Sequence, residues 1–241
     1  MKSVSLTNVG LVRETNQDSI INLRDSKEDY FLAVADGMGG HKAGDVASGI
    51  AARALALFFE NCDKSDILSN KEKITGEIKL INDAILAKSR EDESCEGMGT
   101  TLTLCVTDGR KAVFYQVGDS RGYILGRNGF RQVTKDQSLV QFMVDTKQIT
   151  NEQAKDHPSR HVILSALGTE NEYDMDIYEE DIREGDIILL CSDGLCDYVQ
   201  DEDMERLITE SADIKAAAAS LVNAANAAGG GDNISVILFE A

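Results

Sequence analysis

Residues 31–37 read Phe-Leu-Ala-Val-Ala-Asp-Gly, so an unbroken apolar run ends directly in an aspartate and a glycine. Two further apolar runs end in the same way, at residues 113–119 (VFYQVGD) and 187–194 (IILLCSDG). A fourth aspartate, in Asp232-Asn233, stands immediately before the apolar run 234–238 (ISVIL). Short apolar runs bounded by Gly, Asn and Asp are typical of buried strands. We therefore expect buried strands that carry aspartates at their ends.

Carboxylates at the ends of buried strands can converge on one rigid, oxygen-rich site, and glycine allows the backbone to approach closely. A donor set of carboxylates, backbone carbonyl and water, without His or Cys, suits Mg²⁺ or Mn²⁺ better than zinc or copper. Taken singly, each aspartate is more readily explained as a turn or helix-cap residue. Their shared position at strand ends favours the metal site.

The remaining pattern predicts further strands and helices around these runs. Strands cluster along the chain instead of alternating strictly with helices, which favours an α+β fold with helices packed on antiparallel sheets. The expected strands are residues 3–9, 19–23, 30–35, 100–107, 112–117, 122–125, 130–133, 173–179, 186–191 and 234–239. The expected helices are residues 43–59, 71–90, 139–145, 201–210 and 213–227.

Composition narrows the class of protein. The 241 residues are 42% hydrophobic, enough for a sizeable core, and with one proline and no linker-like tract we expect a single domain over 1–241. Asp and Glu number 42 against 24 Lys and Arg, a formal charge of −18 that disfavours nucleic acid as a partner. No apolar run approaches the roughly 20 residues of a membrane helix, so we expect no membrane partner and a cytoplasmic location. The 5 cysteines contain no CxxC pair and favour reduced thiols over disulfides or zinc.

Nine short segments, in order along nearly the whole chain, resemble the motifs of the PPM-type (type-2C) metal-dependent Ser/Thr protein phosphatases in their compact bacterial form. The segments are residues 13–18 (RETNQD), 34–48 (VADGMGGHKAGDVAS), 99–101 (GTT), 117–121 (VGDSR), 136–139 (DQSL), 157–158 (HP), 166–168 (ALG), 192–195 (SDGL) and 230–233 (GGDN). This resemblance implies an α-β-β-α sandwich, in which two mainly antiparallel sheets are flanked by helices and the metals lie at one end.

The resemblance also implies a site with two Mn²⁺ or Mg²⁺ ions. Asp36, Asp193 and Asp232 resemble the ligands of one ion, and Asp36 with the Gly37 carbonyl resembles those of the second, so that Asp36 bridges the pair. The resemblance further implies that two such ions activate a bridging water or hydroxide, which attacks the phosphoester directly without a phosphoenzyme.

Three more residues carry roles implied by the resemblance. Asp119, together with Asp193, resembles the ligands of a weaker third metal. Asp18 resembles the residue that anchors metal-bound water, although a turn or cap after Asn16 explains it as well. Arg13 resembles the arginine that grips the substrate phosphate, and a guanidinium fork can pair with two phosphoryl oxygens.

Some positions depart from the family pattern. Met38 stands where some eukaryotic relatives have a histidine proposed as general acid, and His41 either approaches the site as a proton donor or packs under its loop. Residues 138–165 resemble a mobile flap beside the metals, or else form an ordinary helical hairpin over a sheet edge. Within that segment, Lys147 stands where many relatives have glycine, and His161 takes a position where asparagine is frequent.

The resemblance implies a monomeric phosphoprotein phosphatase that acts on phosphoserine and phosphothreonine, with Ser/Thr-phosphorylated proteins and a cognate Ser/Thr kinase as partners. A catalytically silent pseudophosphatase that binds metal or a partner is the alternative, and the presence of every expected aspartate weighs against it. A two-metal hydrolase of nucleotides or phosphodiesters ranks last, because the chain has no basic groove, aromatic stacking run or Walker-type loop.

Overall fold

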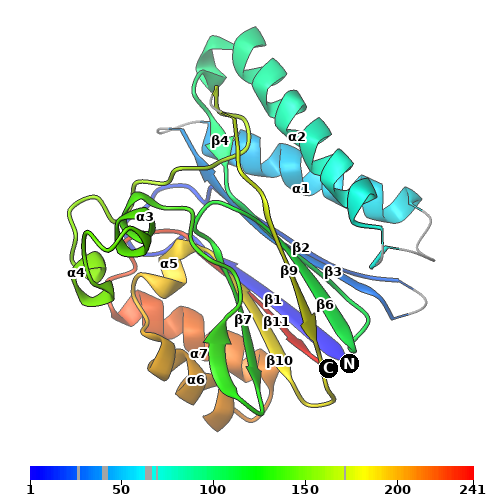
Figure 1. Ribbon diagram of the computed structural model, residues 1–241, viewed down its shortest axis with the longest axis vertical. Helices are drawn as coiled ribbons and strands as arrows, with labels where there is room; N and C mark the ends of the chain where they lie inside the picture. The colour runs from blue at the N-terminus through cyan, green and yellow to red at the C-terminus, as the bar shows by residue number, and fades with distance from the viewer. Residues whose placement is uncertain (26–27, 40–42, 63–66, 69, 171) are drawn as a thin grey trace.

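Two antiparallel sheets lie face to face, with helices on both outer faces (Figure 1). The computed structural model describes residues 1–25, 28–39, 43–62, 67–68, 70–170 and 172–241. The first sheet has the order β1 (Lys2–Asn8), β11 (Ile234–Glu240), β10 (Ile187–Cys191), β7 (Arg121–Gly126) and β8 (Gly129–Gln132). The second has the order β2 (Asp18–Arg24), β3 (Tyr30–Met38), β5 (Leu102–Thr107), β6 (Lys111–Val117) and β9 (Asp176–Asp181), with β4 (Gly99–Thr100) paired to β3. The predicted α+β sandwich is confirmed.

Three apolar clusters hold the layers together. Helices α1 (Gly44–Asn61) and α2 (Lys71–Glu91) pack on the second sheet. Helices α5 (Asp193–Cys196), α6 (Asp201–Glu210) and α7 (Ile214–Ala227) pack on the first sheet. The third cluster fills the space between the sheets.

The unbroken apolar runs of the sequence are explained by burial on both faces of each sheet. In β3, Phe31 and Ala33 pack towards the helices, whereas Leu32 and Val34 pack between the sheets. Strand β10 divides in the same way, with Leu189 facing the helices and its neighbours facing the other sheet. Because successive side chains of a strand point to opposite faces, a strand buried on both faces needs apolar residues at every position.

The strand ends that carry the aspartates meet at one end of the sandwich. Asp18 at the start of β2 is the cross-strand partner of Asp36 in β3. In the first sheet, β10 ends and β11 begins at this same end, whereas Lys2 and Glu240 pair at the other, where both termini lie (Figure 1).

The structure differs from the predicted elements in several places. The expected strand 100–107 is broken at Thr101, whose hydroxyl accepts a hydrogen bond from the Asp36 amide at 3.0 Å. The expected strand 173–179 is shifted to β9, and the short helices α4 (Asn151–Lys155) and α5 and the 3-10 turn η2 (Glu93–Cys95) had no counterpart in the prediction.

The segment 138–165 contains α3 (Leu139–Asp145) and α4, and neither helix buries a residue. Lys147, between them, has a φ of 58°. This left-handed conformation favours glycine, which agrees with the glycine that the family pattern has where this chain has Lys147. Within the described part of the chain, no helix combines the length and the hydropathy needed to cross a membrane.

Two residues of α2 give a paired test of the packing. Ile78 is fully buried in the cluster under the second sheet, and Leu80 on the same helix is 63% exposed. Ile78→Ala should lower the free energy of unfolding by about 2–5 kcal/mol because it leaves a cavity, and Leu80→Ala should change it by less than about 0.5 kcal/mol. Urea denaturation followed by circular dichroism measures both values, and equal losses would contradict this packing.

Candidate metal centre

A cavity of about 1280 Å³ opens at the end of the sandwich where the aspartate-bearing strands meet. Its lining includes six of the seven residues predicted for the site: Arg13, Asp36, Gly37, Asp119, Asp193 and Asp232. The seventh, Asp18, is buried behind the lining as the cross-strand neighbour of Asp36. The structure therefore brings together residues that are up to 219 positions apart in the chain.

The backbone at Asp36 is held from both sides. Its amide donates to Thr101 Oγ1 at 3.0 Å, and its carbonyl accepts hydrogen bonds from Thr100 Oγ1 and from the Thr101 amide, each at 2.9 Å. A Cβ atom on Gly37 would lie 2.0 Å from the Gly44 carbonyl oxygen, so only glycine fits beside the start of α1. The Asp36 carboxylate and the Gly37 carbonyl thus sit on a rigid strand end.

Asp193 and Asp232 lie on neighbouring segments that touch through glycine. Asp193 is the first residue of α5, and a Cβ on Gly194 would lie 1.9 Å from the Asn233 carbonyl oxygen. The Asp232 carboxylate accepts a hydrogen bond from the Asn233 amide at one oxygen and from the Arg13 guanidinium at the other, both at 2.8 Å.

Asn233 holds the loop that presents Arg13. Asn233 is 5% exposed, and its side-chain amide donates to the carbonyls of Val9 (3.0 Å) and Thr15 (2.9 Å) and accepts from the Gln17 backbone amide (2.8 Å). Sequence reasoning included Asn233 only as part of a motif and missed this role. Its direct adjacency to a candidate ligand was the available signal.

Asp18 is tied to the strand ends of the other sheet. One of its carboxylate oxygens accepts a hydrogen bond from Ser192 Oγ at 2.8 Å, and the same hydroxyl accepts from the Ser235 amide at 3.0 Å. Burial raises the pKa of Asp18 to about 6, although hydrogen bonds from Ser235 and Ser192 act in the opposite direction.

The carboxylates oppose one another electrostatically. Burial, followed by repulsion from the neighbouring aspartates, raises the pKa values of Asp36 and Asp193 well above the ordinary range. Burial, followed by repulsion from Asp136 and Asp197, raises the pKa of Asp119 to about 7. A cation at the centre of the cluster would offset this repulsion and favour the ionised carboxylates.

A second observation also indicates that this cluster of carboxylates suits a divalent cation. Among the described residues, one carboxylate oxygen of Asp18 and one of Asp193 are buried without a hydrogen-bond partner. Buried polar atoms are normally satisfied, so these unpaired oxygens are suited to act as ligands of a cation. The donors are oxygens from carboxylates and a backbone carbonyl, the set that suits Mg²⁺ and Mn²⁺.

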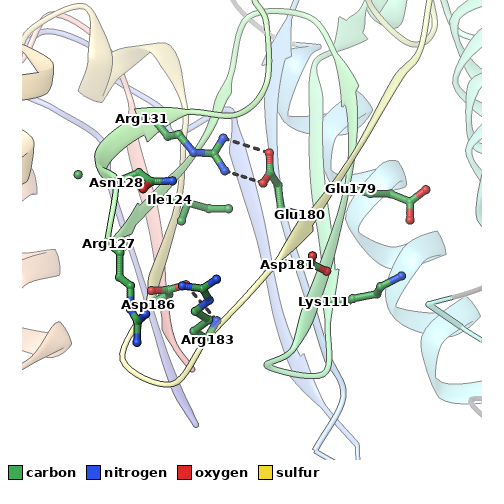
Figure 2. Close-up of a pocket in the computed structure, with 12 residues that line it drawn as sticks. Lys111, Ile124, Arg127, Asn128, Arg131, Glu179, Glu180, Asp181, Arg183 and Asp186 are labelled. Carbon is green, nitrogen blue, oxygen red and sulfur yellow. Dashed lines mark hydrogen bonds and ion pairs between the residues drawn. The ribbon is translucent and has the colours of Figure 1, made fainter.

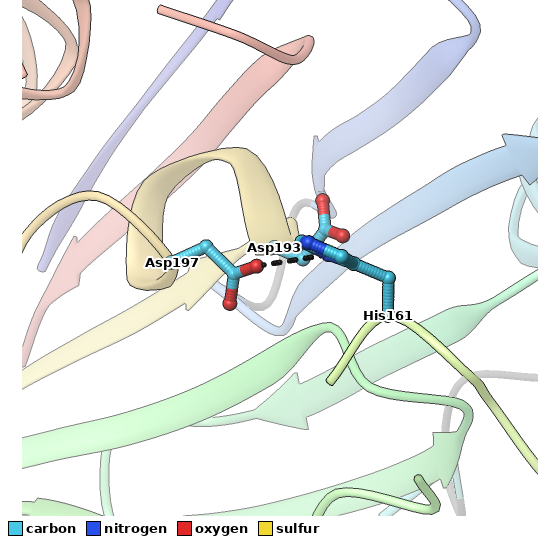
Figure 3. Close-up of side chains that lie close together, drawn as sticks. All are labelled: His161, Asp193 and Asp197. Carbon is cyan, nitrogen blue, oxygen red and sulfur yellow. Dashed lines mark ion pairs between the residues drawn. The ribbon is translucent and has the colours of Figure 1, made fainter. Parts of the chain in front are cut away.

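A smaller cluster of His161, Asp193 and Asp197 adjoins the cavity (Figure 3), with ligand atoms that lie within 4.8 Å of one another. His161 Nδ1 lies 3.2 Å from a carboxylate oxygen of Asp197. Asp197 was not among the predicted site residues, although its spacing of four from Asp193 puts both on one helix face. The cluster brings segment 138–165 to the wall of the cavity, whereas His41 lies outside the described residues.

A second cavity, of about 540 Å³, lies at the opposite end between β9 and the β7–β8 hairpin (Figure 2). Within it, the Arg131 guanidinium donates to both carboxylate oxygens of Glu180, and the backbone amide of Arg183 donates to the Asp186 carboxylate. None of the predicted site residues lines it.

Comparison with known proteins agrees with this fold. A family model described as Protein phosphatase 2C matches residues 12–226, and the chain belongs to this family of enzymes. The serine/threonine phosphatase stp of Listeria welshimeri is 36% identical over 237 residues, which span 97% of this chain and 93% of that protein.

Two solved structures are similar over nearly their whole length. The crystal structure of the serine/threonine phosphatase Stp1 from Staphylococcus aureus has a TM-score of 0.94 at 32% identity, covering 100% of this chain and 94% of that one. The catalytic domain of the serine/threonine protein phosphatase PstP, in complex with 2 manganese ions, has a TM-score of 0.85 at 36% identity, covering 98% of this chain and 96% of that one.

The raised pKa values predict how stability depends on pH in the presence of a chelator. A carboxyl group whose pKa is higher in the folded state stabilises the fold fully below its unfolded value of about 4, and this contribution is lost as the pH rises through the folded value. With Asp18 at about 6 and Asp119 at about 7, stability in chelator should fall between about pH 4 and pH 7. Thermal unfolding should show this fall, and Mn²⁺ should raise the melting temperature more at pH 7.5 than at pH 4.5.

Asp193→Asn provides the control for this profile, because it removes one charge from the cluster and keeps the shape of the side chain. In chelator, the variant should be more stable than the wild type at pH 7.5, and the difference should shrink at pH 4.5. Parallel profiles for the two proteins would show that the cluster does not cause the pH dependence.

Proposed function

We propose that the chain hydrolyses phosphoserine and phosphothreonine in phosphoproteins, in a reaction that depends on two divalent ions, Mn²⁺ or Mg²⁺. The observation that carries this proposal is the convergence of Asp36, Asp193 and Asp232 with the Gly37 carbonyl in one cavity beside Arg13. The printed names of the relatives as serine/threonine phosphatases support the substrate class, and the manganese complex of PstP supports the metal.

The proposed ligands are Asp36, Asp193 and Asp232 for one ion, and Asp36 with the Gly37 carbonyl for the other. When bound, the ions would supply a bridging, water-derived nucleophile and neutralise charge on the phosphoryl oxygens. Asp119 and Asp193 would hold a weaker third ion. The side chains of Thr101 and Ser120 support this arrangement. The Thr101 hydroxyl accepts from the Asp36 amide, and it lies 2.8 Å from the hydroxyl of Ser120, the residue after Asp119.

Asp18 would orient the site from behind. Its contact with Ser192, the residue before Asp193, couples the start of β2 to the end of β10. Its second carboxylate oxygen has no hydrogen-bond partner among the described residues, and it would be free to accept from metal-bound water.

Arg13 would bind the substrate phosphate. Its guanidinium donates to Asp232 through Nη2, and this hydrogen bond is the main cause that raises the pKa of Arg13. The side chain is 51% exposed, so donors remain available on the cavity side for phosphoryl oxygens. The pairing with Asp232 holds the guanidinium at the rim and pre-orients it for an anion.

The wider expectations are part of the same proposal. We propose that the protein is a cytoplasmic monomer with one phosphatase domain over 1–241 and a flap at 138–165. We also propose that a cognate Ser/Thr kinase is among its partners. These proposals fit the acidic composition and the bacterial phosphatase relatives. The alternative pseudophosphatase would share the metal centre and lack turnover.

Phosphate release from a phosphothreonine peptide tests the proposal. Wild-type protein should release phosphate with Mn²⁺ or Mg²⁺ and none in chelator, and Asp193→Asn should lose at least about a hundredfold in rate because an ionised ligand is removed. Asp186→Asn, in the second cavity, is the matched control and should retain wild-type rates. Folded, Mn²⁺-binding wild-type protein without turnover would favour the pseudophosphatase.

Arg13→Ala separates phosphate binding from metal binding. Loss of the guanidinium should raise KM for the phosphopeptide and lower turnover, whereas the Mn²⁺ concentration for half-maximal activation should stay equal or fall, since a cation that competes for Asp232 is gone. Steady-state kinetics over a Mn²⁺ titration measures both, with Arg183→Ala as the control. A parallel loss of substrate and metal affinity would contradict the assignment.

A further inference from the structure

Two adjacent apolar side chains stand in solvent immediately before Arg13. Leu11 is 69% exposed and Val12 is 68% exposed, the highest values among the exposed large apolar side chains of the described residues. Single exposed apolar residues are ordinary on protein surfaces. An adjacent pair at the rim of the cavity that holds the phosphatase chemistry needs a further explanation.

The loop that carries this pair is held by hydrogen bonds and close backbone contacts. The Leu11 amide donates to the Gly230 carbonyl at 2.7 Å, and a Cβ on Gly230 would lie 2.8 Å from Leu11 Cγ. Gly10, with a φ of 81°, brings the chain against the Asp232 carbonyl, where a Cβ would lie 2.2 Å from the oxygen. The side-chain amide of Asn233 donates a hydrogen bond to the Val9 carbonyl. Such a pre-ordered surface loses little entropy on binding.

The position of the pair connects it to the substrate path. Val12 lines the cavity together with Arg13, and Ile163 of segment 138–165 adds another apolar side chain to the lining. An extended peptide advances about 3.3 Å per residue. When its phosphate lies at Arg13, side chains one to three residues away come within reach of Val12 and Leu11.

We propose that Leu11 and Val12 form a docking surface for apolar side chains that flank the phosphorylated residue of a phosphoprotein substrate, so that the enzyme prefers phosphosites with apolar neighbours. This inference rests on the proposed phosphatase function. Leu11 and Val12 are themselves uncharged, and the charged residues that follow them, Arg13 and Glu14, line the cavity together with the carboxylates of the site. The pair therefore offers apolar contact instead of charge pairing.

Three phosphothreonine peptides that differ only in the flanking residues, which are Leu, Ser or Lys, test the proposal. Wild-type protein with Mn²⁺ should hydrolyse the Leu peptide with a kcat/KM about tenfold above that of the Ser peptide, the factor expected for burying a part of one or two apolar side chains. In the Leu11→Ser/Val12→Ser double variant, KM for the Leu peptide should rise, so that kcat/KM for the Leu peptide becomes nearly equal to kcat/KM for the Ser peptide. Val12→Ile should keep the preference.

The control is Leu57→Ser/Leu80→Ser, which removes two apolar side chains of similar exposure, 59% and 63%, from α1 and α2. This variant should keep the peptide preference of the wild type. Hydrolysis of p-nitrophenyl phosphate, which has no flanking residues, serves as the reference rate for every variant.

The outcomes distinguish the two proposals. Equal rates on all three peptides, a preference for the Lys peptide, or a loss in Leu11→Ser/Val12→Ser that is the same for every substrate would overturn the docking surface and leave the phosphatase standing. No hydrolysis of any substrate by metal-loaded wild-type protein would overturn the phosphatase and the docking surface with it.

Discussion

The burial of several mutually repelling carboxylates at one end of the sandwich is the constraint on which the rest of the structure depends. Asp18, Asp36, Asp119 and Asp193 all have raised pKa values, and burial is the largest cause for each. Groups that repel one another would separate if their supports could move. The fold prevents this separation because each carboxylate lies at a strand end or in a tight turn. The strands next to these positions, such as β3 and β10, are buried on both faces and cannot shift easily.

Three polar side chains around the carboxylates fix the distances between the strand ends, which strand pairing alone does not determine. Thr101 joins the Asp36 amide to the turn beside Asp119, Ser192 joins Asp18 to β11, and Asn233 fastens the loop of Arg13. Each of these side chains bonds to main-chain atoms of a segment distant in sequence. A buried hydrogen bond to the main chain restricts position more than apolar packing does, because it depends on both distance and angle.

Sequence reasoning identified the sheets because strands buried on both faces leave unbroken apolar runs, as in residues 31–35. It also located Asp36, Asp119, Asp193 and Asp232, since each stands where such a run begins or ends, whereas Asp18 was indicated only by the family resemblance. It missed the break at Thr101, the short helix α5, and the contact between His161 and Asp197, the residue directly after α5. These features arise from contacts between segments far apart in the chain, and local hydrophobic periodicity does not predict such contacts. The metal roles of the aspartates stay predictions that the geometry supports.

The pairing of Lys2 with Glu240 has a practical consequence for handling the protein. Both chain ends lie side by side (Figure 1), at the end of the first sheet opposite the one where β10 ends and β11 begins. A linker, label or surface attachment at either end would therefore orient the open cavity outwards, towards solution. One tethering geometry thus serves both ends, and it presents the same face to an approaching macromolecule in each case.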